Sequence, residues 1–425
     1  MSLTAPFRRT GFAGLLIGQV VSITGDRFNY LALIALITAH AAARGQNPAP
    51  LLAALAWAML GPALVCSPWA GAVVDRLPLT RVLVWTDLAR AAVVALIPVA
   101  YLATHSTVPV FALVALAFAL NAFFLPARSA LPPQLVSGAE LQPANAILVL
   151  GGVLATLVGT ALGGPVVDRF GPSPALWIDA ATYLVSVLAL ATLLRAGIGA
   201  RRAPSDRGRA GWGTALSEAR AGWSILASNA GARTPVVASV ATWIAGGVLH
   251  VAGTPHVLRG STHVTGLGLL LGALAVGAAL GSAVTLARPR VGHARALAIG
   301  LFGAGIGLAG FALATAPWAM TLAAAWTGFF AAPVFFVSET AIQEAVPEAA
   351  RARVFSARDF LSKGSFLAVT ALAAPLVARF GTAVPIGLAG GVLMMIALIV
   401  LAARPRAADA SQLSSRGETP CSEDA

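Results

Sequence analysis

A short polar stretch decides the fold of this chain: it reads Gly71-Ala72-Val73-Val74-Asp75-Arg76 and is followed by Arg81. It lies in a short gap between two long apolar runs. Glycine lets two helices approach closely, and an aspartate can accept hydrogen bonds from the N-terminus of a neighbouring helix or pair with an arginine. We therefore expect a functional loop at a membrane edge. The alternative is a simple helix cap beside an arginine that fixes topology.

The composition around this stretch is that of an integral membrane protein. The chain has 425 residues, of which 58% are hydrophobic and 10% are charged, whereas soluble proteins carry about 25% charged residues. The net charge of +12 comes from arginines between apolar runs. Such spacing is typical of membrane topology and not of a basic surface for nucleic acid.

Apolar runs long enough to cross a bilayer recur along the chain, since a membrane-spanning helix needs about 20 apolar residues. The runs cover residues 12–39, 51–71, 82–103, 109–126, 144–166, 174–195, 234–254, 265–287, 295–314, 317–337, 359–379 and 384–403. Most gaps between them contain proline, glycine or charge, as helix ends do. The sequence predicts an all-α membrane protein with twelve transmembrane helices.

The distribution of positive charge predicts the orientation, because arginine and lysine gather on the cytoplasmic side. With a cytoplasmic N-terminus, the inside segments hold Arg8, Arg9, Arg76, Arg81, Arg128, Arg201, Arg202, Arg207, Arg209, Arg288, Arg290, Arg351, Arg353, Arg358 and Lys363. The outside segments hold Arg44, Arg169, Arg259 and Arg379. We expect a multi-pass protein of a bacterial inner (plasma) membrane with both termini in the cytoplasm.

The longest polar gap divides the chain into related halves. Residues 1–195 are predicted to form an N-terminal six-helix bundle, 196–233 a cytoplasmic linker, 234–405 a C-terminal six-helix bundle and 406–425 a disordered tail. Within the linker, apolar residues recur at helical spacing: Trp212, Leu216, Ala219, Trp223 and Leu226. This amphipathic segment either lies on the inner membrane surface or packs on the protein itself.

Several short motifs occur in a distinctive order. They are Gly18-Gln19, Gly25-Asp26, Gly71 through Arg76, Asp87-Leu88-Ala89-Arg90, Pro126-Ala127-Arg128, Ala144-Asn145-Ala146, and Gln343-x-x-x-Pro347 through Arg353-Val354-Phe355. Together they resemble the major facilitator superfamily, in a branch similar to enterobactin exporters and macrolide efflux permeases. The resemblance implies two pseudo-symmetric six-helix bundles and alternating access around a midplane site.

The same resemblance assigns a role to the opening stretch. It implies that Gly71, Asp75, Arg76 and Arg81 form a conformational latch, which holds the halves together when the site faces outward. Asp87, Arg90 and Arg128 are expected near the same membrane face, where they would extend the latch. In the C-terminal half Thr285 stands where the family has an acid, so a second latch there should be weak or absent.

A second copy of the pattern occurs in Gly164-Pro165-Val166-Val167-Asp168-Arg169. Helix parity places it outside, so we interpret it as a helix end with a short turn and not as a latch. Just before it, Gly159, Gly163 and Gly164 resemble the glycines of an antiporter motif. Small residues at helical spacing also serve ordinary close packing, and both interpretations stay open.

Asp26 and Arg27 are unusual charges near the middle of the first apolar run. A charge there costs roughly 2.5–3.5 kcal/mol on insertion scales. Asp26 is predicted to carry a coupled proton, with Arg27 tuning it or binding an anionic substrate group; the alternative is a structural pair. Neighbouring residues on a helix do not face one another, so separate partners are expected. Asp179, near the outer face, is expected to snorkel or cap.

Further polar and aromatic residues lie on helices that can border the cavity, although each is also a common packing residue. They are Tyr30, Asn121, Trp243 and His250. The sequence contains no nucleotide loop, metal-ligand spacing or catalytic triad. We therefore expect no enzyme activity and no cofactor or metal. The expected partners are a small-molecule substrate, protons and the lipid bilayer, with no nucleic acid, and the chain is expected to be a monomer.

The sequence thus predicts a secondary transporter that exports an amphipathic small molecule, such as a drug-like compound or siderophore, by proton antiport. Two alternatives remain: a proton-coupled importer or lipid flippase of the same fold, and a membrane scaffold or sensor that does not transport.

Overall fold

A computed structural model of the chain describes Phe7 and residues 11–199, 212–258, 263–287 and 291–402. The helices that precede the long polar gap are α1 (Phe12–Ala43), α2 (Ala49–Arg76), α3 (Leu79–Thr104), α4 (Val108–Ala130), α5 (Pro132–Leu135), α6 (Gly138–Phe170) and α7 (Pro172–Arg195). The helices after it are α8 (Trp212–Ser228), α9 (Ala230–Val248), a π-helical turn η2 (Leu249–Gly253), α10 (Thr254–Leu258), α11 (Thr265–Ala287), α12 (His293–Leu313), α13 (Pro317–Ala345), α14 (Glu348–Phe380) and α15 (Ala383–Ala402).

The prediction of twelve membrane spans is confirmed within this described part of the chain. Twelve helices are long and apolar enough to cross a membrane, with α9, η2 and α10 forming one of them. Short helices and turns connect them, because proline and glycine end most of the spans. Gly171, for example, follows α6 with φ at 87°, a backbone conformation that side chains disfavour.

Several helices, among them α2 and α14, extend past the boundaries that hydropathy predicts. α2 continues to Arg76, so the opening stretch forms its last turns, and the gap before α3 is only Leu77 and Pro78. α14 begins at Glu348, ahead of the predicted run 359–379, which places Arg358 inside a helix instead of a loop. The apolar signal stops where charge begins, whereas the backbone hydrogen bonds of a helix continue as it leaves the bilayer.

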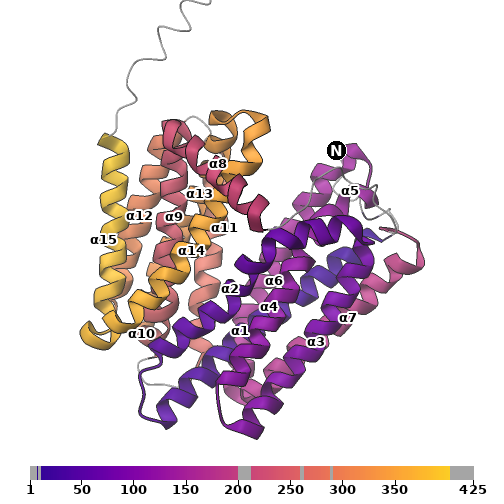
Figure 1. Ribbon diagram of the computed structural model, residues 1–425. Helices are drawn as coiled ribbons and strands as arrows, with labels where there is room; N and C mark the ends of the chain where they lie inside the picture. Colours follow the sequence, from indigo (N-terminus) through magenta and orange to yellow (C-terminus); the bar gives the residue numbers. More distant parts are fainter. Residues whose placement is uncertain (1–6, 8–10, 200–211, 259–262, 288–290, 403–425) are drawn as a thin grey trace, which may run out of the picture.

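The spans form two bundles (Figure 1). In the first, α1 packs on α6 and α7, and α3 packs on α4; α3 also packs on α7, and α4 on α2. In the second, α11 packs on α13, α12 on α13 and α15, and α9 on α14. We call these bundles the N half and the C half. They meet chiefly where α6 contacts α11 and where α2 contacts α14.

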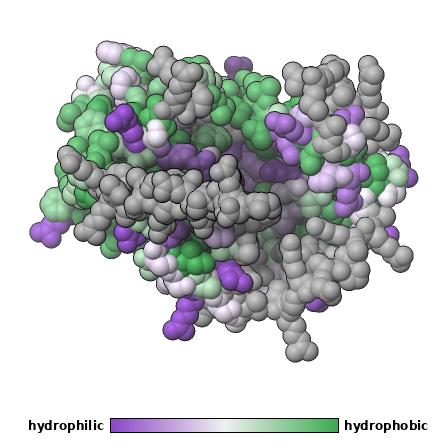
Figure 2. Space-filling view, turned by 90° about the horizontal axis from the view of Figure 1, so that it is seen from above, coloured by the Kyte–Doolittle hydropathy of each residue, from purple (hydrophilic) through white to green (hydrophobic). Residues whose placement is uncertain are grey.

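The two halves diverge toward one side of the molecule. We call the side where α1 begins and α15 ends the terminal face, and the opposite side the far face. Near the far face, Ala49 and Ala53 of α2 belong to the core of the C half, while Val264 and Leu267 belong to that of the N half. Toward the terminal face the halves separate (Figure 1), and hydrophilic residues lie in the hollow between them (Figure 2).

Glycines let α11 and α13 pack at backbone contact. A Cβ atom at Gly277 would overlap the carbonyl oxygen of Ala325, and one at Gly281 would overlap that of Phe329. In a membrane, helices associate through close packing because lipid is as apolar as their side chains. These glycines therefore hold the C half together, and Thr285 on the same helix donates only to the carbonyl of Gly281.

The amphipathic segment forms α8, which packs on the C half at the terminal face. A Cβ at Gly222 would overlap the carbonyl oxygen of Arg353, so α8 crosses α14 closely. Leu226 is buried in a small core with Val354 and Ala357. The apolar face of α8 is thus covered by protein near its end, while Trp223 stays 46% exposed. The predicted tail, 406–425, and part of the predicted linker lie outside the described residues.

Candidate functional site

A charged cluster lies in the middle of the N half, where α1, α3 and α7 meet. Arg90 of α3 contacts the Asp26 carboxylate of α1 at 3.1 Å and donates to the Tyr183 hydroxyl of α7 at 2.5 Å. That hydroxyl donates in turn to Asp26. The guanidinium also lies 4.2 Å from the centre of the Tyr183 ring. These contacts fix the orientation of Asp26.

Arg90 serves a second carboxylate as well. Its other terminal nitrogen lies 3.5 Å from Asp87, and the Ser186 hydroxyl donates to Asp87 at 2.6 Å. Asp87 and Arg90 were expected at the membrane edge with the latch. That expectation is wrong, because helix α3 carries both side chains inward to Asp26, where the exposed fraction of the Asp87 side chain is 0%.

Asp179 also departs from its expected place. It is fully buried, and it accepts hydrogen bonds from Asn29 at 2.7 Å and from the Thr182 hydroxyl at 3.3 Å. Snorkelling to the membrane surface is therefore excluded. Three buried or partly buried carboxyl groups thus surround one paired guanidinium, a density of charge that membrane spans rarely contain outside functional sites.

Exposure distinguishes Asp26 within this cluster. Its side chain is 37% exposed, compared with 7% for Arg90. Since α1 extends about 21 Å from Phe12 to this position at ~1.5 Å per residue, Asp26 lies deep in the span. Two carboxylates share one guanidinium here, so uptake of a single proton would neutralise the Asp26–Arg90–Asp87 group.

Arg27, the next residue, has a different environment. Its stem packs over Gly159 of α6, and its Nε atom is buried without a hydrogen-bond partner. None of the described residues accepts a hydrogen bond from it. Asp26 and Arg27 are therefore not partners, which agrees with their separate directions on the helix.

Tyr30 and His250 join the two halves. The Tyr30 hydroxyl lies 3.0 Å from Nδ1 of His250, and Nε2 of His250 lies 3.0 Å from the Leu52 carbonyl. His250 sits on the π-helical turn η2, a feature that is frequent at functional sites. Phe366 packs against His250 with ring centres 6.2 Å apart.

Aromatic rings continue from this contact into the C half. Trp243 of α9 meets Phe366 edge-on at 5.9 Å and Phe335 at 6.5 Å. Asn121 lies on α4 of the N half, partly buried, and forms no hydrogen bond to a described residue. The structure brings Tyr30, His250 and Trp243 into one aromatic series but shows no contact between Asn121 and that series.

The residues of the predicted latch are only partly described. The surroundings of Gly71 and of the Asp75 side chain lie outside what the structure describes. Arg76 and Arg81 are exposed, next to the short connection between α2 and α3. Arg128, on the last turn of α4, is partly buried, and none of the described residues accepts a hydrogen bond from it.

The second copy of the pattern makes a contact that its sequence interpretation missed. Asp168 accepts hydrogen bonds from the backbone N–H groups of Val264 at 2.7 Å and Thr265 at 2.9 Å, and from the Thr265 hydroxyl at 2.5 Å. Asp168 does end a helix, as expected, but it also binds the first turn of α11 in the other half. Helix parity predicted the face of the bundle on which Asp168 lies. Only the packing of α6 against α11 shows that its partner is Thr265.

The three glycines of α6 serve two interfaces. A Cβ at Gly159 or Gly163 would press on Arg27 or Phe28 of α1, and one at Gly164 would lie 2.6 Å from the Cα of Thr265. The Gly159–Gly163 pair therefore packs within the N half, while Gly164 permits the close contact between halves at the far face.

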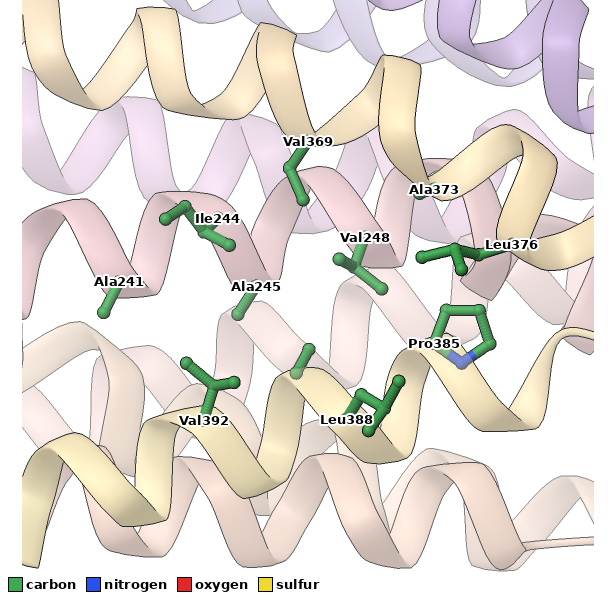
Figure 3. Close-up of a pocket in the computed structure, with 11 residues that line it drawn as sticks. Ala241, Ile244, Ala245, Val248, Val369, Ala373, Leu376, Pro385, Leu388 and Val392 are labelled. Atoms are coloured by element: carbon green, nitrogen blue, oxygen red, sulfur yellow. The ribbon is translucent and has the colours of Figure 1, made fainter.

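A separate cavity of about 180 Å³ lies between α9, α14 and α15. Its lining is entirely apolar, and the side chains from the three helices point toward one another (Figure 3). It lies within the C half and contains none of the charged residues described above. The cluster around Asp26, and not this cavity, is therefore the candidate functional site.

The comparison with known families agrees with this arrangement of twelve spans around a charged centre. The sequence profile of the Major Facilitator Superfamily matches residues 15–362. The chain belongs to the Major Facilitator Superfamily. It is therefore a multi-pass membrane protein of a transporter family, and the expectation that it is no enzyme agrees with this membership.

Two curated proteins are similar in sequence to part of this chain. The multidrug efflux pump Tap of Mycolicibacterium fortuitum is 30% identical over 284 residues, which cover 64% of each chain. The uncharacterized MFS-type transporter YvqJ of Bacillus subtilis (strain 168) is 29% identical over 179 residues, covering 42% of this chain and 41% of YvqJ. The aligned part of this facilitator thus spans less than two thirds of either relative.

Solved structures confirm the fold. A mutant of the peptide transporter POT with bound sulfate superposes with a TM-score of 0.69 at 15% identity, over 92% of this chain and 94% of that one. A mutant of the nucleoside transporter NupG gives 0.69 at 14% identity, over 92% and 99%. At such identities the likeness extends to the fold alone.

Proposed function

We propose that this chain is a proton-coupled exporter of amphipathic small molecules that works by alternating access. The observation that carries the proposal is the cluster of Asp26, Arg90 and Tyr183, because it places a partly exposed carboxylate deep in a membrane span. A buried ionisable group in a span marks an ion pathway by default. Similarity to a multidrug efflux pump supports export as the direction.

In this mechanism the described conformation is the one open to the terminal face, which the charge distribution of the sequence places in the cytoplasm. Substrate enters the hollow between the halves from that side. The Tyr30–His250 and Asp168–Thr265 contacts hold the far face closed. A proton that reaches Asp26 from outside in the alternate state, and leaves it inside, would couple the gradient to export.

The cluster gives the proton a defined effect. Ionised Asp26 binds Arg90 and Tyr183 and so ties α1 to α3 and α7. Protonation removes the charge from this contact, and a charged hydrogen bond contributes about 1.5–3 kcal/mol compared with ~1 kcal/mol for a neutral one. A loosened α1 can then move relative to α6, and it carries with it Tyr30, which bears the contact with the other half.

The direct test is flux in proteoliposomes that contain the purified chain and an imposed pH gradient, with the amphipathic dye anilinonaphthalene sulfonate as the transported probe. Wild type should move the dye against its own gradient when the destination side is acidic, and Asp26→Asn should not. Flux in the opposite direction would indicate an importer. Absence of flux for this dye, and for the compounds found in a resistance screen in an efflux-deleted host, would favour a scaffold.

A further inference from the structure

Arg27 is a guanidinium inside a membrane span, and none of the residues that the structure describes accepts a hydrogen bond from it. Its neighbour Asp26 is already held by Arg90 and Tyr183, and Arg27 projects from a different side of α1. Its Nε atom is shielded from solvent and has no hydrogen-bond partner in the described part of the chain. An uncompensated charge in a membrane span is costly, so such a residue needs a function that explains it.

Arg27 lies at the closed end of the hollow between the halves. One turn further toward the far face, Tyr30 meets His250 of the C half. Beside it, Gly159 supports the Arg27 stem, and the next residue, Thr160, presents its carbonyl to Gly268 of α11 in backbone contact. The halves therefore close directly beyond Arg27, while the hollow opens on the terminal side (Figure 2).

The C half faces this position with aromatic rings. His250 contacts Tyr30 and Phe366, and Phe366 continues to Trp243. Trp243 and Phe366 are only partly buried, so their faces and edges are available to a planar ligand. Aromatic rings stack favourably with other rings, beyond the effect of simple burial.

We propose that Arg27 binds the acidic group of an aromatic, amphipathic substrate whose ring system packs on Trp243 and Phe366. The substrate class is therefore organic anions and zwitterions with a carboxylate, sulfonate or phosphate. A guanidinium presents a planar fork of donors that fits such groups bidentately. This inference rests on the proposed transport function, since it names what that transporter carries.

The test uses two fluorescent probes that differ by one acidic group: anilinonaphthalene sulfonate and its uncharged analogue phenylnaphthylamine. Binding is measured on the full chain in nanodiscs of zwitterionic lipid, by energy transfer from tryptophan, with empty nanodiscs as the blank. Wild type should bind the sulfonate more tightly than the analogue by about tenfold or more, the factor expected for one charged hydrogen bond. Arg27→Ala should reduce this ratio to about one, and Arg27→Lys should retain part of it.

Two controls separate recognition from folding. Arg169→Ala removes an exposed arginine at the far end of α6 and should keep the wild-type ratio. Binding of the uncharged analogue should be unchanged in Arg27→Ala, which shows that the aromatic surface is intact; if that variant fails to fold, Arg27→Lys and Arg27→Gln decide. A ratio that survives loss of Arg27, or a wild type that does not discriminate, overturns the inference. Failure of gradient-driven flux with the ratio intact would instead reject the transport function.

Discussion

The carboxylate of Asp168, in the last turn of α6, accepts hydrogen bonds from both the backbone N–H and the hydroxyl of Thr265, in the first turn of α11. The two residues belong to different halves. The first N–H groups of a helix lack partners inside it, and the helix dipole makes its N-terminus attract negative charge. Asp168 therefore caps a helix of the opposite half and holds the far face closed.

Loss of this cap should open the far face. We expect Asp168→Ala to shift the equilibrium toward the state open on that side by about tenfold or more, because it removes hydrogen bonds to a charged acceptor. Distances between spin labels at Gln46 and His263 report the change. Arg169→Ala is the matched control, and an unchanged distance distribution in Asp168→Ala would show that the other contacts suffice.

The opposite face offers a contrasting prediction. We expect Asp75→Asn to slow or abolish transport while expression and membrane insertion stay normal, since the resemblance places the inner latch at that residue. Thr285→Ala should do much less, because its hydroxyl bonds only to the carbonyl of its own helix at Gly281. Flux assays on both variants compare the predicted latch of the N half with the corresponding position of the C half. Equal losses of transport would contradict the predicted difference between the halves.

Variants of Asp26 and Tyr183 should distinguish proton coupling from substrate binding. We expect Asp26→Asn to abolish gradient-driven efflux and still permit substrate exchange, because the amide imitates the protonated acid. Tyr183→Phe keeps the ring over Arg90 and removes only the hydroxyl bonded to Asp26. Its flux should survive with a displaced pH profile. Normal efflux by Asp26→Asn with an unchanged pH profile would remove Asp26 from the mechanism.

Backbone contact between α11 and α13 gives a prediction about stability. Gly277→Ala would place a methyl group against the carbonyl oxygen of Ala325, and overpacking of this kind costs about 1–3 kcal/mol. We expect a lower melting temperature and a lower yield. Gly310→Ala is the control, since no atom lies within 4 Å of its new Cβ. Equal melting temperatures would show that the helices can separate at little cost.

The orientation can be tested without a substrate, in a background where Cys66 and Cys421 are replaced by serine. Cysteines at Gln46 and Thr104, both on the far face, should react with an impermeant thiol reagent added to intact cells. One at Ser228, at the end of α8, should not. Labelling of Ser228 from outside would invert the proposed direction of transport.

The sequence by itself determined the parts of this protein that depend on local chemistry. Hydrophobic length alone specifies a span, because the bilayer accepts only helices that satisfy their own backbone groups. Twelve runs therefore predicted twelve spans, and the order of short motifs indicated the superfamily. Where charge met the helix ends, as at Arg76 of α2 and Arg358 of α14, the same local signal made the predicted helix too short.

Only the tertiary structure decided which charges meet. Arg90 was assigned to a latch from its place in the chain, yet helix packing turns it toward Asp26, 64 residues away, and Tyr183, 93 residues away. Asp168 was correctly placed at a helix end on the far side, but its partner Thr265 belongs to the other half, 97 residues later. A hydropathy pattern records how deep a side chain lies and leaves its direction around the bundle open. Contacts between helices fix that direction, and with it the partners of each buried charge.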